Sequence, residues 1–357
     1  MNPDPARNRD RVRPGGLGAR EREVLKSVIR AHIVTGTPVG SKTLSLGTGM
    51  DLSPATIRNV MAELEERGLL VQPHPSAGRV PTDTAYRLYV DHWMGAPRVV
   101  PAQAQAIDEA LRTRRDVAEL LEEASRQLSR LSHHVGVVLA PELRRIVVEH
   151  LEFVRLDPRR VVAVLVDRTG VVHNRIVEDE NASDQEDLDR VGRWLTDQFA
   201  GRTLQQMREE LLRRVSEEWA AGLALARKAV EPAAGEPEGE LFVEGMANLL
   251  DEPAFADLAR MRAILKTLEE KSRLVDLLGR VLDGEGVQVV IGSENPLPGL
   301  ADCSLVTSTY GAGDRVLGTV GVVGPTRMEY ARTVALVDHL AKVLTRLLSS
   351  PGARGPA

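Results

Sequence analysis

Apolar residues recur at helical spacing through the first part of the chain. Over residues 19–35 they follow a period of about 3.6 residues, which predicts a helix. This helix should end at Gly36, because glycine readily adopts the left-handed conformation found after helices. A turn and a short helix over residues 41–46 are predicted next. Ser53 and Pro54 predict the start of a third helix, since serine is a favoured N-cap and proline is tolerated at the first helical position.

The polar face of this third helix changes character along its length. Arg58 and Asn59 lie near its start, whereas Glu63, Glu65 and Glu66 crowd its end. A polyanion attracts the first group and repels the second. We therefore expect only the N-terminal half of the helix to approach nucleic acid. The other face carries an apolar stripe typical of a core: Ile57, Val60, Met61 and Leu64.

A β-hairpin is predicted directly after this helix. Residues 69–72 form its first strand, residues 73–78 its tip and residues 79–81 its second strand, and Thr82 then starts another helix. Helix, short helix, capped helix and hairpin is the order of a winged helix-turn-helix, a module that inserts its recognition helix into the major groove of DNA. We expect this DNA-binding domain over residues 17–96.

Eleven residues of this domain are candidates for contact with DNA. Arg58 and Asn59 are expected to contact bases, because arginine pairs with guanine and asparagine with adenine through two hydrogen bonds each. Residues at the starts of the second and third helices are expected to hold phosphates. The alternative, that these side chains merely face solvent, is less favoured once the whole order of elements is considered. The expected set is Ser41, Lys42, Thr43, Ser53, Ala55, Thr56, Arg58, Asn59, His74, Ser76 and Arg79, with Arg79 on the hairpin loop.

Beyond Pro97 and Pro101 the pattern predicts an α+β domain with an antiparallel sheet. It begins with a helix over residues 102–132 and ends with a helix over about residues 327–349. The expected strands are residues 135–140, 146–156, 161–166, 171–177, 287–291, 304–310 and 316–323, with hairpin turns at residues 167–170 and 311–314. We assign residues 97–182 and 284–350 to this domain.

A mostly helical stretch, residues 183–283, interrupts this domain. Its apolar face is formed by Met207, Leu211, Val215, Trp219, Leu223 and Ala226. A segment inserted between strands of one sheet lies outside that sheet's domain, so its apolar face needs a partner. Packing against the sheet domain and contact with a second subunit are equally favoured by the periodicity alone.

Composition places the chain among ordinary globular proteins, with 43% hydrophobic and 27% charged residues. The net charge of −5 is unevenly distributed: residues 1–91 hold 13 Lys and Arg against 10 Asp and Glu, and the remainder holds 33 against 41. A basic first quarter fits contact with a polyanion there, although the excess is small. Residues 1–16, with four arginines and few apolar residues, are predicted to be a disordered basic arm that is solvated rather than bound to DNA.

The sequence contains no sign of catalytic, metal or membrane chemistry. It has no phosphate-binding glycine loop ending in lysine and no zinc-binding His-Glu-x-x-His helix, and the adjacent His133 and His134 would point in different directions on a helix. The lone Cys303 has no obvious base beside it and is expected to be a small buried hydrophobe. We therefore expect no enzyme, no cofactor and no metal. A single thiol, no long apolar run and no signal peptide indicate a cytoplasmic protein.

Several long segments make the sequence recognisable. They are residues 53–65 (SPATIRNVMAELE), 72–82 (QPHPSAGRVPT), 293–296 (SENP) and 318–330 (GTVGVVGPTRMEY). In this order they resemble the heat-inducible transcription repressor family HrcA, and they span most of the chain. Two positions depart from the family pattern: Val60 stands where an acid is usual, and Pro75 where threonine is usual.

The resemblance implies more than the residues themselves do. It implies a GAF-like antiparallel sheet domain carrying an inserted dimerising domain, so that the protein is a homodimer. It also implies repression of chaperonin and Hsp70 operons through an inverted-repeat operator (CIRCE), with release on heat shock, and dependence on the chaperonin GroEL. The alternative is a ligand-gated transcription regulator whose GAF-like domain holds an effector.

Overall fold

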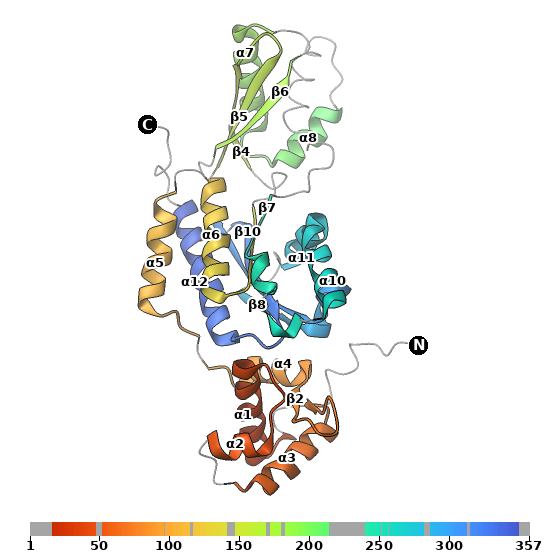
Figure 1. Cartoon of the computed structure of the whole chain (residues 1–357). Coiled ribbons are helices and arrows are strands. Elements are labelled where there is room, and N and C mark those ends of the chain that lie inside the picture. The colour runs from red at the N-terminus through yellow and green to blue at the C-terminus, as the bar shows by residue number, and fades with distance from the viewer. Residues whose placement is uncertain are drawn as a thin grey trace.

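The computed structural model has three parts that lie end to end (Figure 1). We call them the N-terminal module (residues 16–95), the body (residues 97–140 and 240–349) and the distal domain (residues 147–213). The fold is a mixture of helices and antiparallel sheets, as the sequence predicts. The structure describes residues 16–47, 52–95, 97–114, 117–140, 147–168, 172–179, 183–213, 240–250, 252–255, 257–281, 286–312 and 315–349.

The N-terminal module has the element order expected from the sequence. Its elements are α1 (Ala19–Thr35), α2 (Ser41–Gly47), α3 (Pro54–Glu66), β1 (Leu70–Val71), β2 (Val80–Pro81) and α4 (Asp83–His92). Gly36 ends α1 with a left-handed φ of 65° and donates its backbone N–H to the carbonyl of His32. Ser53 caps α3, because its hydroxyl accepts a hydrogen bond from the backbone N–H of Thr56 at 3.2 Å.

The apolar stripe of α3 is buried as predicted. Ile57, Met61 and Leu64 are at most 1% exposed, and they share one core with α1 and α4. Val60, which departs from the family pattern, is 8% exposed in the same core. A valine therefore contributes apolar burial at this position, where a carboxylate needs a polar partner or solvent.

The body is a five-stranded antiparallel sheet with helices on both faces. The strand order is β7-β3-β10-β9-β8. In Figure 1, α5, α6 and α12 lie on one side of this sheet, and α10 and α11 lie on the other. The elements are α5 (Pro101–Arg112), α6 (Val117–Ser132), β3 (Val135–Leu139), β7 (Leu241–Glu244), α10 (Leu258–Glu269), α11 (Lys271–Val281), β8 (Val287–Ile291), β9 (Cys303–Ala312), β10 (Arg315–Pro325) and α12 (Tyr330–Ser349), with short 3-10 turns at Met246–Leu249, Pro253–Phe255, Gly292–Glu294 and Pro298–Leu300.

The distal domain is a separate three-stranded sheet that α7 and α8 cover on one face. Its core joins Leu151, Phe153 and Leu165 of the sheet to Phe199 and Met207 of the two helices. The sheet order is β4-β5-β6, and every pair is antiparallel. The elements are β4 (Val148–Arg155), β5 (Arg160–Asp167), β6 (Val172–Glu178), α7 (Gln185–Phe199) and α8 (Leu204–Arg213).

The structure corrects three expectations drawn from the sequence. The helix expected over residues 102–132 is two helices, α5 and α6. The strands expected over residues 146–177 pair with one another and not with the sheet of the body. Residues 240–281 belong to the body, because β7 pairs with β3 and because α10 and α11 pack on its sheet.

The insert was expected over residues 183–283, but the distal domain already begins at residue 147 and the chain is back in the body by residue 240. Alternating apolar residues mark a strand with one buried face, but they do not identify the sheet that the strand joins. Of the apolar face predicted within the insert, Met207 and Leu211 are buried in the distal core. The expected basic arm up to residue 15 lies outside the described residues, as do Val215, Trp219, Leu223 and Ala226.

No helix in the described ranges is long and apolar enough to cross a membrane.

Helix α6 lies so close to β3 that only glycine fits at position 136. A Cβ built there overlaps the backbone carbonyl oxygen of Ser125. We expect Gly136→Ala to push α6 away from the sheet and to destabilise the body by about 1–3 kcal/mol. Thermal unfolding followed by circular dichroism measures this change. The matched control is Gly40→Ala, where the nearest atom to a new Cβ is 3.9 Å away, and an equal melting temperature for both variants would contradict the close contact.

Candidate nucleic-acid interface

The helix that carries the expected base contacts lies at the free end of the molecule. In Figure 1, α2 and α3 are on the side of the N-terminal module that faces away from the body. The side chains of Arg58 and Asn59 are exposed on α3. Neither makes a hydrogen bond or an ion pair with any residue that the structure describes. Both are therefore available to a ligand.

Several other cations of the N-terminal module are already paired. Arg67 lies 3.2 Å from Glu21, Arg79 lies 2.8 Å from Glu65, and Arg87 is paired with Asp91 and with a residue of the body. Lys42 on α2, like Arg58, has no such partner among the described residues, and its side chain is exposed. The surface formed by α2 and the start of α3 thus keeps positive charge that no described carboxylate neutralises, a condition for binding a polyanion.

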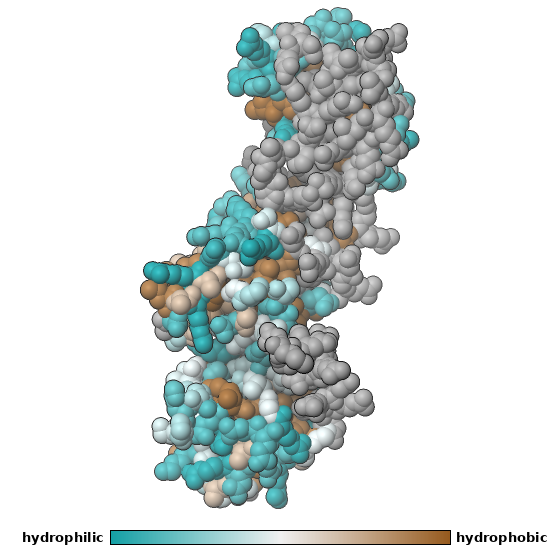
Figure 2. Space-filling view, turned by 90° about the vertical axis from the view of Figure 1, so that its right-hand side faces the viewer, coloured by the Kyte–Doolittle hydropathy of each residue, from teal (hydrophilic) through white to brown (hydrophobic). Residues whose placement is uncertain are grey.

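The remaining helical candidates surround these two cations. Ser41 is half-buried and Thr43 is exposed, both in the first turn of α2. Ser53 and Ala55 are exposed at the start of α3. Thr56 is half-buried, and its hydroxyl lies 2.9 Å from the hydroxyl of Ser53. The hydroxyls of Ser53 and Thr56 therefore help to form the start of α3. The surface of the module that is visible in Figure 2 is mainly hydrophilic.

The hairpin presents a closed tip. The side-chain amide of Gln72 donates hydrogen bonds to the carbonyls of Pro75 at 3.0 Å and Ala77 at 2.9 Å. His74 and Ser76 are exposed on this tip. These internal bonds fix the loop, so the two exposed side chains project from a defined backbone.

Arg79 is held at the base of the hairpin and does not stand on the loop. Its side chain is only 15% exposed, and Nε donates to Oε2 of Glu65 at 2.8 Å. Its backbone also exchanges two hydrogen bonds of 2.9 Å with Val39, in the segment before α2. Arg79 therefore joins the hairpin to α3 and to the start of α2.

Glu65 is a positioning residue that sequence reasoning missed. The sequence assigned it to the end of α3 that repels a polyanion. In the structure, its carboxylate accepts hydrogen bonds from Arg79 and from the backbone N–H of Gln72, at 2.8 and 3.2 Å. It thereby fixes the hairpin against α3. Helical periodicity does not reveal this contact, because the partners come from a different element; the opposite charges of Glu65 and Arg79 were the available signal.

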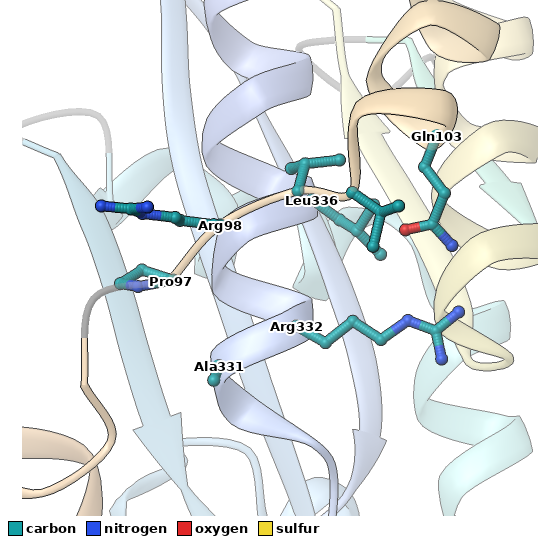
Figure 3. Close-up of a pocket in the computed structure, with 8 residues that line it drawn as sticks. Pro97, Arg98, Gln103, Ala331, Arg332 and Leu336 are labelled. Carbon is teal, nitrogen blue, oxygen red and sulfur yellow. The ribbon is translucent and has the colours of Figure 1, made fainter.

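The body contains an open cavity of about 610 Å³ beside the segment that links it to the N-terminal module. Residues 97–100, Gln103 and the start of α12 line this cavity. Figure 3 shows that the guanidinium groups of Arg98 and Arg332 point to opposite sides and do not converge on one point. Arg332 also donates to the carbonyl of Leu131 at 2.8 Å. The two arginines thus do not form a common site for an anion.

Burial makes the other potentially reactive side chains inert. Cys303 is buried, as predicted, and burial raises the pKa of its thiol to about 12, so the thiol stays protonated. Burial, more than the neighbouring His133 and nearby arginines, lowers the pKa of His134 to about 4, so this imidazole is neutral near pH 7. Within the described ranges, no group of three or more His, Cys, Asp or Glu side chains is placed to hold a metal ion.

Comparison with known proteins gives consistent matches. The family model for the C-terminal domain of HrcA protein matches residues 118–334. The heat-inducible transcription repressor HrcA of Geobacter sulfurreducens is 41% identical over 336 residues, which cover 93% of this chain and 98% of that protein. The protein of the same name from Syntrophobacter fumaroxidans is 41% identical over 345 residues, covering 94% and 99%. A crystal structure of a hypothetical protein has the same fold, with a TM-score of 0.61 and 23% identity, and the match covers 93% of this chain and 99% of that one.

The geometry of the hairpin base leads to a prediction about Gly78. A Cβ at this position would lie 2.5 Å from the backbone carbon and oxygen of Val39. We expect Gly78→Ala to separate the hairpin from the segment before α2 and to break the paired backbone hydrogen bonds of Val39 and Arg79. Hydrogen exchange measured by NMR should then be faster at both amides, whereas Ser76→Ala on the exposed tip should leave them unchanged. Equal protection in both variants would show that the hairpin is not held at this point.

Proposed function

The chain belongs to the heat-inducible transcription repressor family HrcA, and from this membership we propose that it represses heat-shock genes by binding an inverted-repeat operator as a homodimer. The genes would be the chaperonin and Hsp70 operons, the operator the CIRCE repeat, and release would follow heat shock. The observation that carries this proposal is the exposed pair Arg58 and Asn59, without partners among the described residues, on the capped half of α3.

In the proposed complex, the N-terminal module acts as a winged helix-turn-helix. Helix α3 enters the major groove by its N-terminal half, and Arg58 and Asn59 contact base edges. Lys42, with hydroxyl groups at the starts of α2 and α3, contacts phosphates and fixes the depth of the helix in the groove. His74 and Ser76 at the tip of the hairpin lie against the flanking backbone. The acidic end of α3 stays outside the groove, since Glu63 and Glu66 are exposed and would meet phosphate charge there.

We propose that the distal domain brings two chains together. No described residue covers the other face of its sheet, and an apolar cross-strand row of Val154, Val162 and Ile176 on that face continues in Val164 and Val166 along β5. The polar residues His150, Glu152 and Asn174 flank this row on the two edge strands. Val154 is 41% exposed and Ile176 is 60% exposed, and Leu156 and Val172 are also exposed. A contiguous exposed apolar surface of this kind marks an interaction site. A two-fold contact through this face would supply the two recognition helices that an inverted repeat requires.

We further propose that the body is the GAF-like domain and that chaperonin GroEL maintains the active fold. The support for the GAF-like assignment is the five-stranded antiparallel sheet covered by helices on both faces. The support for chaperonin dependence is family membership alone. A repressor whose folded population depends on a chaperone responds to the amount of free chaperone, because anything that stabilises the native state shifts its population.

A ligand-gated regulator is the second candidate function, and the cavity beside residues 97–100 is the observation that favours it. An effector bound there would touch the segment that joins the N-terminal module to the body. Thermal-shift screening separates the two functions, because a specific ligand raises the melting temperature whereas the proposed heat-shock mechanism needs no such ligand.

The base contact leads to a direct test. Fluorescence anisotropy at fixed salt, with and without GroEL, should show a preference of about 10³ or more for an inverted-repeat duplex from a chaperonin operon over a scrambled duplex. Arg58→Ala should cost about 1–3 kcal/mol on the repeat, whereas Lys42→Ala should weaken both duplexes alike and flatten the salt dependence. Arg190→Ala on the distal domain is the control. Unchanged binding of Arg58→Ala to both duplexes would refute α3 as the recognition helix.

The dimer contact has its own test. Ile176→Asp places a charge on the exposed apolar row, and burying that charge opposes association. We expect the dimer to weaken about tenfold or more in analytical ultracentrifugation. Leu258→Asp, on the body, is the matched control, because Leu258 is 63% exposed and outside the distal domain. If the Ile176→Asp variant remains a dimer and the Leu258→Asp variant dissociates, the interface lies on the body and not on the distal domain.

A further inference from the structure

The N-terminal module is attached to the body by more than the chain that links them. One hydrophobic core runs through both parts, from Val28 and Tyr86 in the module to Ile291 and Tyr330 in the body. The rings of Tyr86 and Tyr330 lie 5.9 Å apart. Turning the module on the body would expose these side chains to water, which opposes free rotation.

Arg87 of α4 forms the first polar contact across this boundary. Its Nε donates to Oε1 of Glu294 at 2.9 Å, and Nη2 is paired with the other oxygen of the same carboxylate. Nη2 also donates to the carbonyl of Val289 in β8 at 2.5 Å. A two-pronged pairing of guanidinium and carboxylate defines both distance and orientation, which a single hydrogen bond does not.

The start of α4 forms a second contact with the same loop. The carboxylate of Asp83 accepts a hydrogen bond from the backbone N–H of Ser293 at 2.8 Å. Gly292 lies directly against this carboxylate, at a left-handed φ of 51°, and a Cβ there would overlap the oxygens of Asp83. The module and the loop at residues 292–294 therefore fit together only because position 292 is glycine.

Arg327 forms a third contact on the other side of the boundary. It donates to the carbonyl of Ile33 in α1 at 3.3 Å and is ion-paired with Glu252 of the body. Its guanidinium also lies under Gly36, where a Cβ would come within 2.9 Å of Cζ. A side chain at position 36 would displace the end of α1 from the body.

The neighbouring His32 keeps this boundary free of an additional positive charge. Its Nδ1 and the hydroxyl of Tyr86 share a hydrogen bond of 2.6 Å. Burial, assisted by the nearby charge of Arg327, lowers the pKa of His32 to about 4, so the imidazole is neutral near pH 7. A neutral imidazole is compatible with the adjacent guanidinium, whereas a charged one would repel it.

We propose that Asp83 and Arg87 of the module, with Glu294 and Arg327 of the body, fix the orientation of the recognition helix and thereby determine which spacing between operator half-sites is accepted. We call these four residues the orientation contact. This inference rests on the proposed function. It assigns a role in specificity to residues that lie outside the candidate DNA interface.

The reason lies in the geometry of DNA. Inserting one base pair between two half-sites moves them about 3.4 Å apart and rotates one against the other by about 35°, since a turn holds about 10–10.5 base pairs. Modules that turn freely on their bodies would follow this rotation at little energetic cost. Modules held by the orientation contact cannot follow it, so a dimer with fixed modules discriminates strongly against the wrong spacing.

The test compares four duplexes: the inverted repeat, the same repeat with one base pair inserted or deleted at its centre, and a single half-site. The variants are Arg87→Met, which keeps the aliphatic stem, and Glu294→Gln, which keeps an acceptor for the backbone N–H of Ile291. Arg190→Ala is the control, because its ion pair with Asp187 lies within α7. Circular dichroism and ultracentrifugation establish that each variant is folded and has the oligomeric state of the wild type.

We expect the wild type and the control to lose about tenfold or more in affinity on insertion or deletion, a loss similar to that of one mismatched base pair. Insertion or deletion should lower the affinity of each orientation-contact variant by less than about threefold, while its affinity for the single half-site stays at the wild-type value. A variant that keeps the wild-type spacing ratio would overturn the inference. If the wild type does not prefer the repeat over the scrambled duplex, the proposed function fails first, so the two failures are distinguishable.

Discussion

The orientation of the N-terminal module depends on a guanidinium group that is shared between the two parts of the molecule. The side chain of Arg327 is only 16% exposed; one terminal nitrogen pairs with Glu252 of the body and the other donates to the end of α1, while the buried Nε has no described partner. A buried cation that loses a partner is strongly destabilising, because neither water nor another dipole replaces the missing contact. Displacing the end of α1 would remove this partner of Arg327, so the contact holds the end of α1 against the body. The core shared by the two parts opposes rotation in the same way.

A second organising feature is the distribution of the carboxylates. Glu21, Glu65 and Glu294 each pair with an arginine of the N-terminal module, and each pair has a structural task. Glu65 fixes the hairpin and Glu294 fixes the module on the body. Lys42 on α2 and Arg58 at the start of α3 have no described partner, and the same holds for Arg20 and Arg30 on α1. The surface proposed to meet DNA thus keeps free positive charge, even though the whole chain carries a net charge of −5.

The sequence predicted those features that depend on local patterns. The caps at Ser53 and Gly36, the buried stripe of α3 and the hairpin follow from propensity and periodicity, and the structure contains all of them. The sequence did not predict which sheet each strand joins, because buried and exposed residues alternate along β4 to β6 as they do in strands of any sheet with one buried face. The same limit explains Arg79: its position after the tip suggested a loop residue, and only the fold brings it to Glu65. Contacts between distant segments need the tertiary structure.

For the proposed dimer, the lengthwise arrangement of the three parts makes rigidity in the body a condition for binding two half-sites. The proposed dimer face lies at one end of the molecule and the proposed DNA face at the other (Figure 1). A small rotation within the body is therefore converted into a large displacement of the recognition helix. Residues 293–296 and the end of the segment 318–330, which contributed to the family resemblance, lie at the boundary that opposes this rotation. On the proposed function, the sequence of these segments is then constrained by the orientation of the module. Partial unfolding of the body would end the proposed operator binding even while α3 itself remained intact.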